Sequence, residues 1–326
     1  MSKIKNIDSL MKYLRDRHNI AISGGHQKRR LRNIGYYHGY KGYRFINTPS
    51  RKIAYTDFNQ VLAINSFDLD LKSIFYPHIM FIETALKNYV LEVTLQHSNT
   101  ENFNEIFDKC LTYYKTFATG SDEYKKALKK RLGLREKIYN TLTRDYTNNR
   151  QVVQHFYHKD ESVPIWAIFE VISLGEFGNF VSCSNINIKK NISTSLNLNQ
   201  SCDANGKLTE SIIYIIKDLR NSIAHNDVVF DTRFKSSNPN GSLLACLRLD
   251  TQITNINFHT IIDYLILVIY LLKNFHVTKT ELNKVVNKFE ILINNFRTLV
   301  PISIYNQIFH TDTRNKLNLL KSFIST

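Results

Sequence analysis

An imidazole, a guanidinium and a carboxamide stand close together between Asp218 and Asn226. Asn221 directly follows Arg220, and His225 comes four residues after Asn221. On a helix, residues four apart share a face, so Asn221 and His225 are neighbours, whereas Arg220 has to reach round with its long side chain. An imidazole titrates near neutrality, and a guanidinium grips phosphate through two hydrogen bonds. These groups suit cleavage of RNA without a metal.

A structural interpretation competes with this chemistry. An arginine and a histidine near the end of a helix can also interact with its last carbonyl groups and with the negative end of its dipole. The segment itself predicts a helix that begins near Leu208 and is buried on one side. Its apolar residues recur at helical spacing: Ile212, Ile213, Ile215, Ile216, Leu219 and Ile223.

Composition predicts a mostly helical fold. The chain has 326 residues, of which 43% are hydrophobic, and only 5 are proline and 11 glycine. So few turn-forming residues favour helices over a turn-rich β fold. The four cysteines show no CxxC spacing, so neither a disulfide framework nor a zinc site is expected, and a reducing cytoplasm fits them. No metal or other cofactor is expected.

The positive charge is concentrated at the amino-terminal end. The net charge is +15, and residues 1–52 hold thirteen Lys and Arg against two Asp, a local excess of +11. Such a polycationic end predicts a polyanionic partner, and interleaved tyrosines suit stacking on unpaired bases. The alternative is an aromatic core plug with a basic rim. The candidate RNA-binding residues are Arg29, Arg30, Arg32, Tyr36, Tyr37, Tyr40, Lys41 and Arg44.

A second basic stretch runs from Lys125 to Lys137 in a region of helical periodicity. Lysines on a solvated helix face are common in a chain rich in Ile, Asn and Lys, so composition explains this stretch better than the first.

The helices expected from periodicity and capping residues extend along the whole chain. Pro77 should kink or divide the long helix over 57–97, and Gly175 and Gly178 should end or bend the helix that starts at Pro164. Residues 184–205 are expected to be loop with short helical pieces, and 228–257 irregular. The other expected helices cover about 8–18, 26–33, 103–118, 122–147, 258–275 and 279–298, with a short one near the end. The apolar run over 261–272 is too short to span a bilayer, which takes about 20 residues.

Several motifs in order resemble the Abi-like family, the AbiD and AbiF group of bacterial abortive-infection proteins. The motifs lie within about residues 7–235: Leu31-Arg32-Asn33-Ile34-Gly35-Tyr36-Tyr37 with Tyr40, Phe67-Asp68-Leu69-Asp70-Leu71, Glu83 with Asn88, Pro164-Ile165-Trp166 with Glu170 and Gly175, and Arg220-Asn221 with Ala224-His225-Asn226. The last of these is similar to the active-site motif of HEPN ribonucleases. The family pattern usually has an arginine after the glutamate, where this chain has Lys87 and Asn88.

The resemblance implies an all-α fold with a HEPN-type helical bundle core, RNA cleavage without metal, and a role in phage defence or as a toxin. The expected division is a basic, Tyr-rich RNA-contacting region over 1–56, the core over 57–235 and a helical extension over 236–326.

Each candidate residue receives an expected role. His225 is the general base or acid, Arg220 stabilises the scissile phosphate, and Asn221 orients the imidazole or the phosphate. Glu83 is a supporting residue, for which Arg220 is a candidate partner. Asn226 is expected to cap the helix in a left-handed conformation.

The predicted protein is thus a cytoplasmic endoribonuclease toxin, bound and restrained by a small structured RNA, without membrane attachment. One Arg/His pair per chain predicts a homodimer that joins two pairs. The competing hypotheses are a non-catalytic RNA-binding defence protein and a DNA-binding regulator, although no helix-turn-helix is evident.

Overall fold

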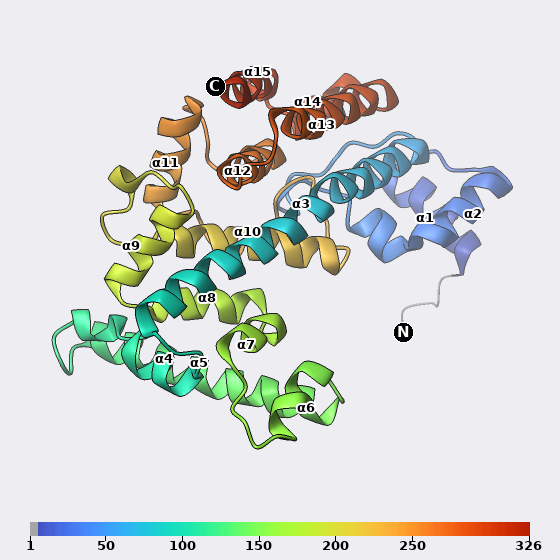
Figure 1. Ribbon diagram of the computed structural model, residues 1–326. Coiled ribbons are helices and arrows are strands. Elements are labelled where there is room, and N and C mark those ends of the chain that lie inside the picture. Colours follow the sequence, from blue (N-terminus) through green and yellow to red (C-terminus); the bar gives the residue numbers. More distant parts are fainter. Residues whose placement is uncertain (1–5) are drawn as a thin grey trace.

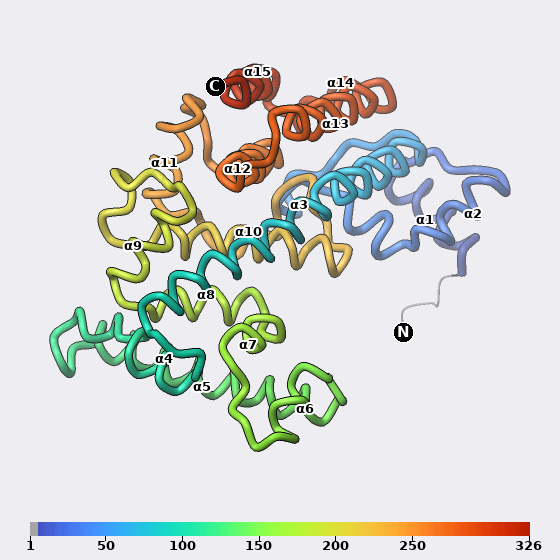
Figure 2. The backbone as a smooth tube through the Cα atoms, viewed as in Figure 1, coloured from blue at the N-terminus to red at the C-terminus, as the bar shows by residue number. Residues whose placement is uncertain are grey.

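A computed structural model describes residues 6–326. This part of the chain folds into fifteen α-helices without a single β-strand, so the predicted all-α fold is confirmed. The path of the chain, followed as a tube in Figure 2, winds repeatedly around one long central helix. The buried hydrophobic residues form a continuous cluster that reaches from Met11 to Ile324.

The central helix is α3 (Phe58–Ser98), which crosses the middle of the molecule in Figure 1. Asp57 caps its first turn, and Gln60 completes a capping box by accepting from the backbone of Asp57. Pro77 lies inside the helix and does not divide it, so of the two expected effects, a kink or a division, the second is excluded. Pro77 and Ser73 are both exposed, so the Ser73 carbonyl that loses its helical partner at Pro77 faces solvent.

The helices at the amino-terminal end gather around the start of α3: α1 (Ile7–His18), α2 (Gly24–Ile34) and the π-helical segment η1 (Gly35–Lys41). Asn6 caps α1. α2 begins at Gly24, two residues before the expected start, and η1 continues it through the tyrosine-rich segment.

The middle of the chain surrounds the other half of α3. It contains α4 (Phe103–Lys109), the 3-10 turn η2 (Tyr113–Thr116), α5 (Asp122–Thr147), α6 (Gln151–Tyr157), α7 (Ile165–Val171), α8 (Leu174–Cys183), α9 (Ile186–Ser195), the 3-10 turn η3 (Gln200–Cys202) and α10 (Leu208–Ala224). The helix expected over 103–118 is therefore interrupted after Lys109, and the region expected to be mostly loop contains the ten-residue helix α9.

The prediction for Gly175 and Gly178 was wrong. Both residues lie inside α8, which starts at a capping box between Ser173 and Glu176. At Gly178 an added Cβ would lie 3.0 Å from the ring of Tyr214 on α10. The missing side chain thus lets α8 and α10 approach closely, and it does not end the helix.

The last ninety residues lie on one side of α3, as the orange and red helices of Figure 1 show. They form α11 (Gly241–Thr251), α12 (Ile261–Asn274), α13 (Lys279–Leu299), α14 (Ile302–Ile308) and α15 (Thr313–Ser325). Two of these helices, α12 and α13, pack against α3. α11 contradicts the expectation of irregular chain over 228–257. Asn240 caps it, and Leu243 and Leu247 bury one face.

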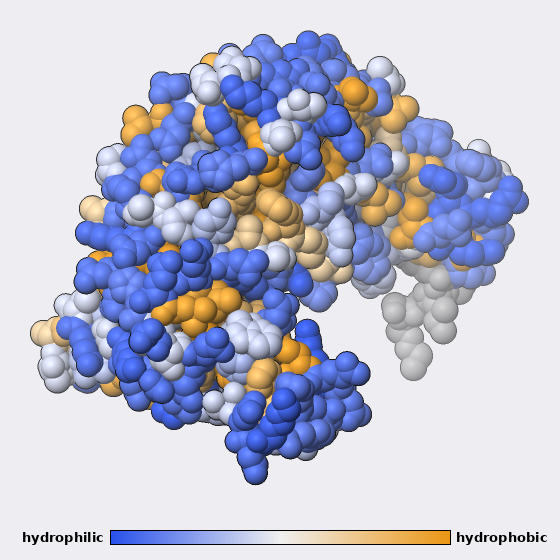
Figure 3. All heavy atoms as spheres, viewed as in Figure 1, coloured by the Kyte–Doolittle hydropathy of each residue, from blue (hydrophilic) through white to orange (hydrophobic). Residues whose placement is uncertain are grey.

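Most of the molecular face in Figure 3 is hydrophilic, and hydrophobic residues show on it only in patches. Over the described part of the chain, none of the helices combines the length and the apolar character needed to cross a membrane.

Candidate functional site at the end of α10

The predicted catalytic residues occupy the last turn of α10 and the residue after it. α10 runs antiparallel to α3, since Arg220 contacts Glu83 while Asn226, further along α10, contacts Lys72, which comes earlier on α3. The chain leaves the helix through a tight cap, in which the Asn226 amide donates to the Ile223 carbonyl and the next amide donates to that of Ser222. This hydrogen-bond pattern is a Schellman motif.

Asn226 takes the left-handed conformation that this cap requires, with φ 57°. The predicted capping role of Asn226 is therefore confirmed. The Asn226 side chain also connects the cap to α3, because its Oδ1 accepts a hydrogen bond of 2.8 Å from the ammonium of Lys72.

Arg220 pairs with Glu83, the partner that the sequence suggested. Arg220 Nε lies 3.2 Å from Glu83 Oε2, and a second guanidinium nitrogen is 3.4 Å from Asn221 Oδ1. The Glu83 carboxylate also forms an ion pair with the ammonium of Lys87, which lies one turn further along α3, with an N–O distance of 3.3 Å. The Arg220 side chain keeps 35% exposure, so the pair fixes the guanidinium while leaving part of it open to solvent.

His225 stands at the cap of α10 and is exposed. Its backbone amide donates to the Asn221 carbonyl at 2.9 Å, which continues the helix by one more bond. Within residues 6–326, its imidazole forms no hydrogen bond or ion pair. The ring is therefore free to exchange protons with a bound molecule.

Asp68 anchors the chain that follows the cap. Its fully buried carboxylate accepts from the amides of Val229 and Phe230 at 2.8 and 2.7 Å, and from the Tyr43 hydroxyl at 2.8 Å. Lys72 forms an ion pair with it, also at 2.8 Å. Burial and the nearby Asp68 raise the pKa of Tyr43, so its hydroxyl stays protonated as the donor. The Asp68 carboxylate thus joins α3, the tyrosine segment (residues 35–45) and the loop after α10.

A second ionic connection holds the amino-terminal segment against this loop. The Arg233 guanidinium binds Asp231 and donates to the Gly42 carbonyl at 2.8 Å, and the Asp231 carboxylate accepts from the Asn47 amide at 2.6 Å. The tyrosine segment is therefore positioned beside the end of α10. Sequence reasoning alone had not foreseen this proximity, which joins residues about 190 positions apart.

A cavity of about 350 Å³ opens where these two segments meet. Its lining includes Tyr37 and His38 from η1, Leu69 from α3, and Asn226 from the end of α10. Tyr37 is 72% exposed, and the Lys41 ammonium lies 4.4 Å from its ring centroid. His38 was not among the predicted site residues, and only its place among the tyrosines could have pointed to it.

The predicted RNA-binding residues fall into two groups. Arg29, Arg30 and Arg32 are exposed on α2, and Tyr36, Lys41 and Arg44 are partly exposed. Tyr40 is buried, like Tyr43, so it serves the core and cannot stack on a base. Of the two interpretations of this segment, the core plug describes Tyr40 and Tyr43, whereas Tyr37 remains available to a ligand.

No cluster of three or more His, Cys, Asp or Glu with metal-site geometry occurs in the part of the chain that the structure describes.

In a comparison with known protein families, the model for Abi-like protein matches residues 29–231. This chain belongs to the Abi-like family. The matched range covers more than half of the chain and includes every motif quoted above, from Leu31 to Asn226. Membership points to a function in abortive infection. Comparisons with curated proteins and with solved structures found no match.

Proposed function

We propose that this Abi-like protein is a HEPN-type endoribonuclease that acts as a toxin in abortive infection, in the cytoplasm, without a metal cofactor. The observation that carries the proposal is the end of α10. There a partly exposed Arg220 is fixed by Glu83, Asn221 lies against the guanidinium, and an unengaged His225 is exposed one turn later.

The proposed reaction is an internal transfer at the RNA backbone. The ribose 2′-hydroxyl attacks the adjacent phosphorus and loses its proton, the bond from phosphorus to the 5′-oxygen breaks, and that oxygen takes up a proton. His225 serves one of the two proton transfers, because an imidazole exchanges protons near neutral pH. Arg220 stabilises the charge that develops on the phosphoryl oxygens. The products carry a 2′,3′-cyclic phosphate and a 5′-hydroxyl.

The second proton transfer motivates a homodimer, in which two copies of this site face one cleft. The exposed hydrophobic residues of α3 support such an arrangement. Tyr76 is 52% exposed and lies two turns before Glu83 on the same stripe of α3, and Leu69 is also exposed. In the proposed dimer a partner covers this stripe, and the His225 of each chain faces the shared cleft. Light scattering of the active species tests this: a strict monomer that still cleaves RNA contradicts it.

The exposed arginines of α2 are proposed to dock RNA, including a small structured RNA that restrains the toxin. Each neutralised phosphate contributes a slope of about −0.9 on duplex and −0.7 on single strands to the log–log dependence of affinity on salt. Replacing Arg29, Arg30 and Arg32 with Ala should flatten that slope. The matched control replaces three exposed cations of α13, namely Lys284, Lys288 and Arg297. Equal slopes in the two variants would refute the docking surface.

A non-catalytic RNA-binding protein is the second candidate, because Glu83 already neutralises the guanidinium that catalysis needs. The ends of the RNA products separate the two functions. Incubation of single-stranded RNA with the purified chain and EDTA should give 2′,3′-cyclic phosphate or 3′-phosphate ends. Intact RNA would favour the binder, and 3′-hydroxyl ends that require magnesium would indicate different chemistry.

A further inference from the structure

A second cavity lies at the opposite end of α10 and belongs to no part of the site described above. It measures about 710 Å³ and opens between α5, η2, α8 and the start of α10. This volume is in the range of pockets that bind small molecules, about 300 to 1,000 Å³. Glu210, which lines it, precedes Arg220 by ten residues, or roughly 15 Å along the helix axis.

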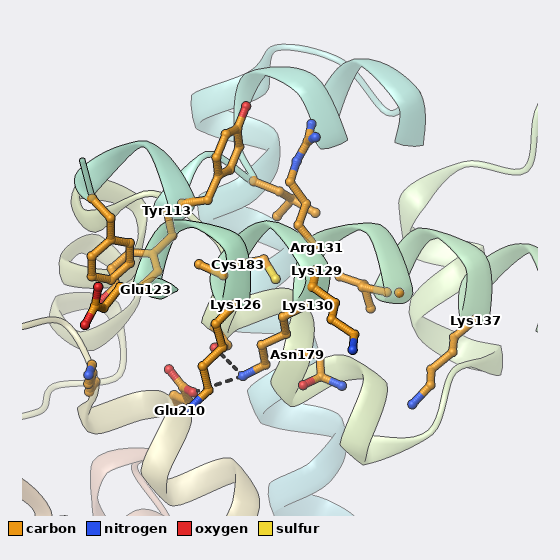
Figure 4. A pocket seen from close by; sticks show the side chains of 18 residues that line it. Tyr113, Glu123, Lys126, Lys129, Lys130, Arg131, Lys137, Asn179, Cys183 and Glu210 are labelled. Carbon is orange, nitrogen blue, oxygen red and sulfur yellow. Dashed lines mark hydrogen bonds and ion pairs between the residues drawn. The ribbon is translucent and has the colours of Figure 1, made fainter. Parts of the chain in front are cut away.

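The lining of this cavity is strongly cationic. Figure 4 shows Lys126, Lys129, Lys130 and Lys137 projecting from one side of α5, and Arg131 pointing the other way. Arg131 is already engaged, because it donates to the Phe107 carbonyl at 2.8 Å and lies 3.0 Å from Asp108.

The acidic residues compensate only part of this charge. Glu210 lies 3.4 Å from the ammonium of Lys130 and 3.7 Å from that of Lys189. Within residues 6–326, three of the lining lysines of α5 form no ion pair: Lys126, Lys129 and Lys137. They belong to the second basic stretch, Lys125 to Lys137, for which composition is the simpler explanation from sequence. Their arrangement around a cavity gives them a common target, which an ordinary solvated helix face would not have.

Lys189 on α9 adds a buried charge immediately behind the wall. Its ammonium has no hydrogen-bond partner in the described chain, and it lies 3.6 Å from the ring centroid of Tyr113, which lines the cavity. Burial lowers the pKa of Lys189 to about 8, although the charge of Glu210 opposes the effect. Glu210 is shared between Lys189 and Lys130, so an anion in the cavity would add to the compensation of this buried charge.

Aromatic rings form another part of the wall. Tyr113, Tyr114 and Phe117 line the cavity from η2 and the residue after it, and all three are partly exposed. Flat aromatic faces beside cations are the elements with which proteins hold nucleotides, stacking on the base and contacting the phosphate. The lining thiol, Cys183, is unsuited to nucleophilic chemistry because burial raises its pKa to about 11. The cavity is therefore equipped for binding.

We propose that this cavity binds a nucleotide, with the phosphate on the lysines of α5 and the base against the rings of η2. The nucleotide is either free or the 5′-phosphorylated end of an RNA chain. The two sources share one chemistry, and they differ in whether the nucleotide has a 3′ neighbour.

Gly133 offers a direct way to test the site. It lines the cavity in the middle of α5, and a Cβ built there meets no atom within 4 Å. Gly133→Leu therefore adds apolar volume at the cavity wall, with open space around its Cβ, and it also removes a helix-weakening glycine. Gly241→Leu is the matched control, because Gly241 likewise has open space at its Cβ and lies on α11, outside the cavity.

Calorimetric titration of the full chain with ATP, with GTP and with a 5′-phosphorylated RNA trinucleotide distinguishes the sources. The proposal expects at least one of these probes to bind to the native chain and to the Gly241→Leu control. Gly133→Leu and the Lys126→Ala, Lys129→Ala double variant should each weaken that binding by about tenfold or more. Tighter binding of the trinucleotide than of both free nucleotides assigns the cavity to an RNA end, and the reverse assigns it to a free nucleotide. Failure of all three probes to bind, or unchanged binding in Gly133→Leu, overturns the proposal.

Discussion

Replacing Asp68 with Asn should destabilise the protein severely. The side chain keeps its shape, so the change removes charge and leaves volume intact. At this buried position Lys72 loses the carboxylate 2.8 Å from its ammonium, and the Tyr43 hydroxyl and two backbone amides lose an ionised acceptor. Breaking a buried ion pair by removing one partner costs about 3–5 kcal/mol, because the other charge is left uncompensated.

Urea unfolding measures this cost, with Asp70→Asn as the matched control. Asp70 lies on the same helix but is exposed, so its substitution should change the free energy of unfolding by no more than about 0.5 kcal/mol. Adding Lys72→Met to Asp68→Asn should recover part of the loss, because no unpaired ammonium remains. If Asp68→Asn cost as little as Asp70→Asn, the carboxylate would not be what holds the loop after α10.

Three further substitutions test separate parts of the structure. Glu83→Gln removes the ionic partner of Arg220, so RNA cleavage should fall by about tenfold in a kinetic assay. The free energy of unfolding should fall by less than the roughly 3–5 kcal/mol typical of a fully buried pair, because Arg220 is 35% exposed. Gly178→Ala forces a Cβ against the ring of Tyr214, which should cost about 1–3 kcal/mol in urea unfolding. Lys189 has a folded pKa of about 8, below its unfolded value, so the native stability should rise between about pH 8 and 10.5 as the unfolded state loses its extra proton. Lys189→Met should abolish that rise and stabilise the protein at pH 7 by up to about 3 kcal/mol, as measured by unfolding at several pH values.

The sequence predicted the helices with long, regular apolar periodicity. Both α3 and α10 repeat apolar residues over several turns, and their burial confirms the expected faces. α11 was missed because the Asn-, Pro- and Ser-rich residues before it resemble a loop, although Asn240 and the spacing of Leu243 and Leu247 are helical signals. Gly178 was misinterpreted because a glycine that ends a helix and one that allows close packing look alike until the neighbouring helix is known.

The candidate site was predictable only in part. The pairing of Arg220 with Glu83 followed from the need of a nearly buried carboxylate for a cation. The bonds of Asp68 and Lys72 to the region after α10 join residues more than 150 positions apart, and periodicity carries no information on such pairs. The neighbourhood of Tyr37, His38 and Asn226 depends on these bonds and was equally hidden.

The most direct test of the central claim is RNA cleavage by His225→Ala in the presence of EDTA. His276→Ala is the matched control, since His276 is likewise exposed just beyond the end of a helix, α12. The proposal predicts that His225→Ala folds and binds RNA like the native chain but no longer cleaves it, while the control cleaves normally. Undiminished cleavage by His225→Ala would contradict the assignment of the active site to the end of α10.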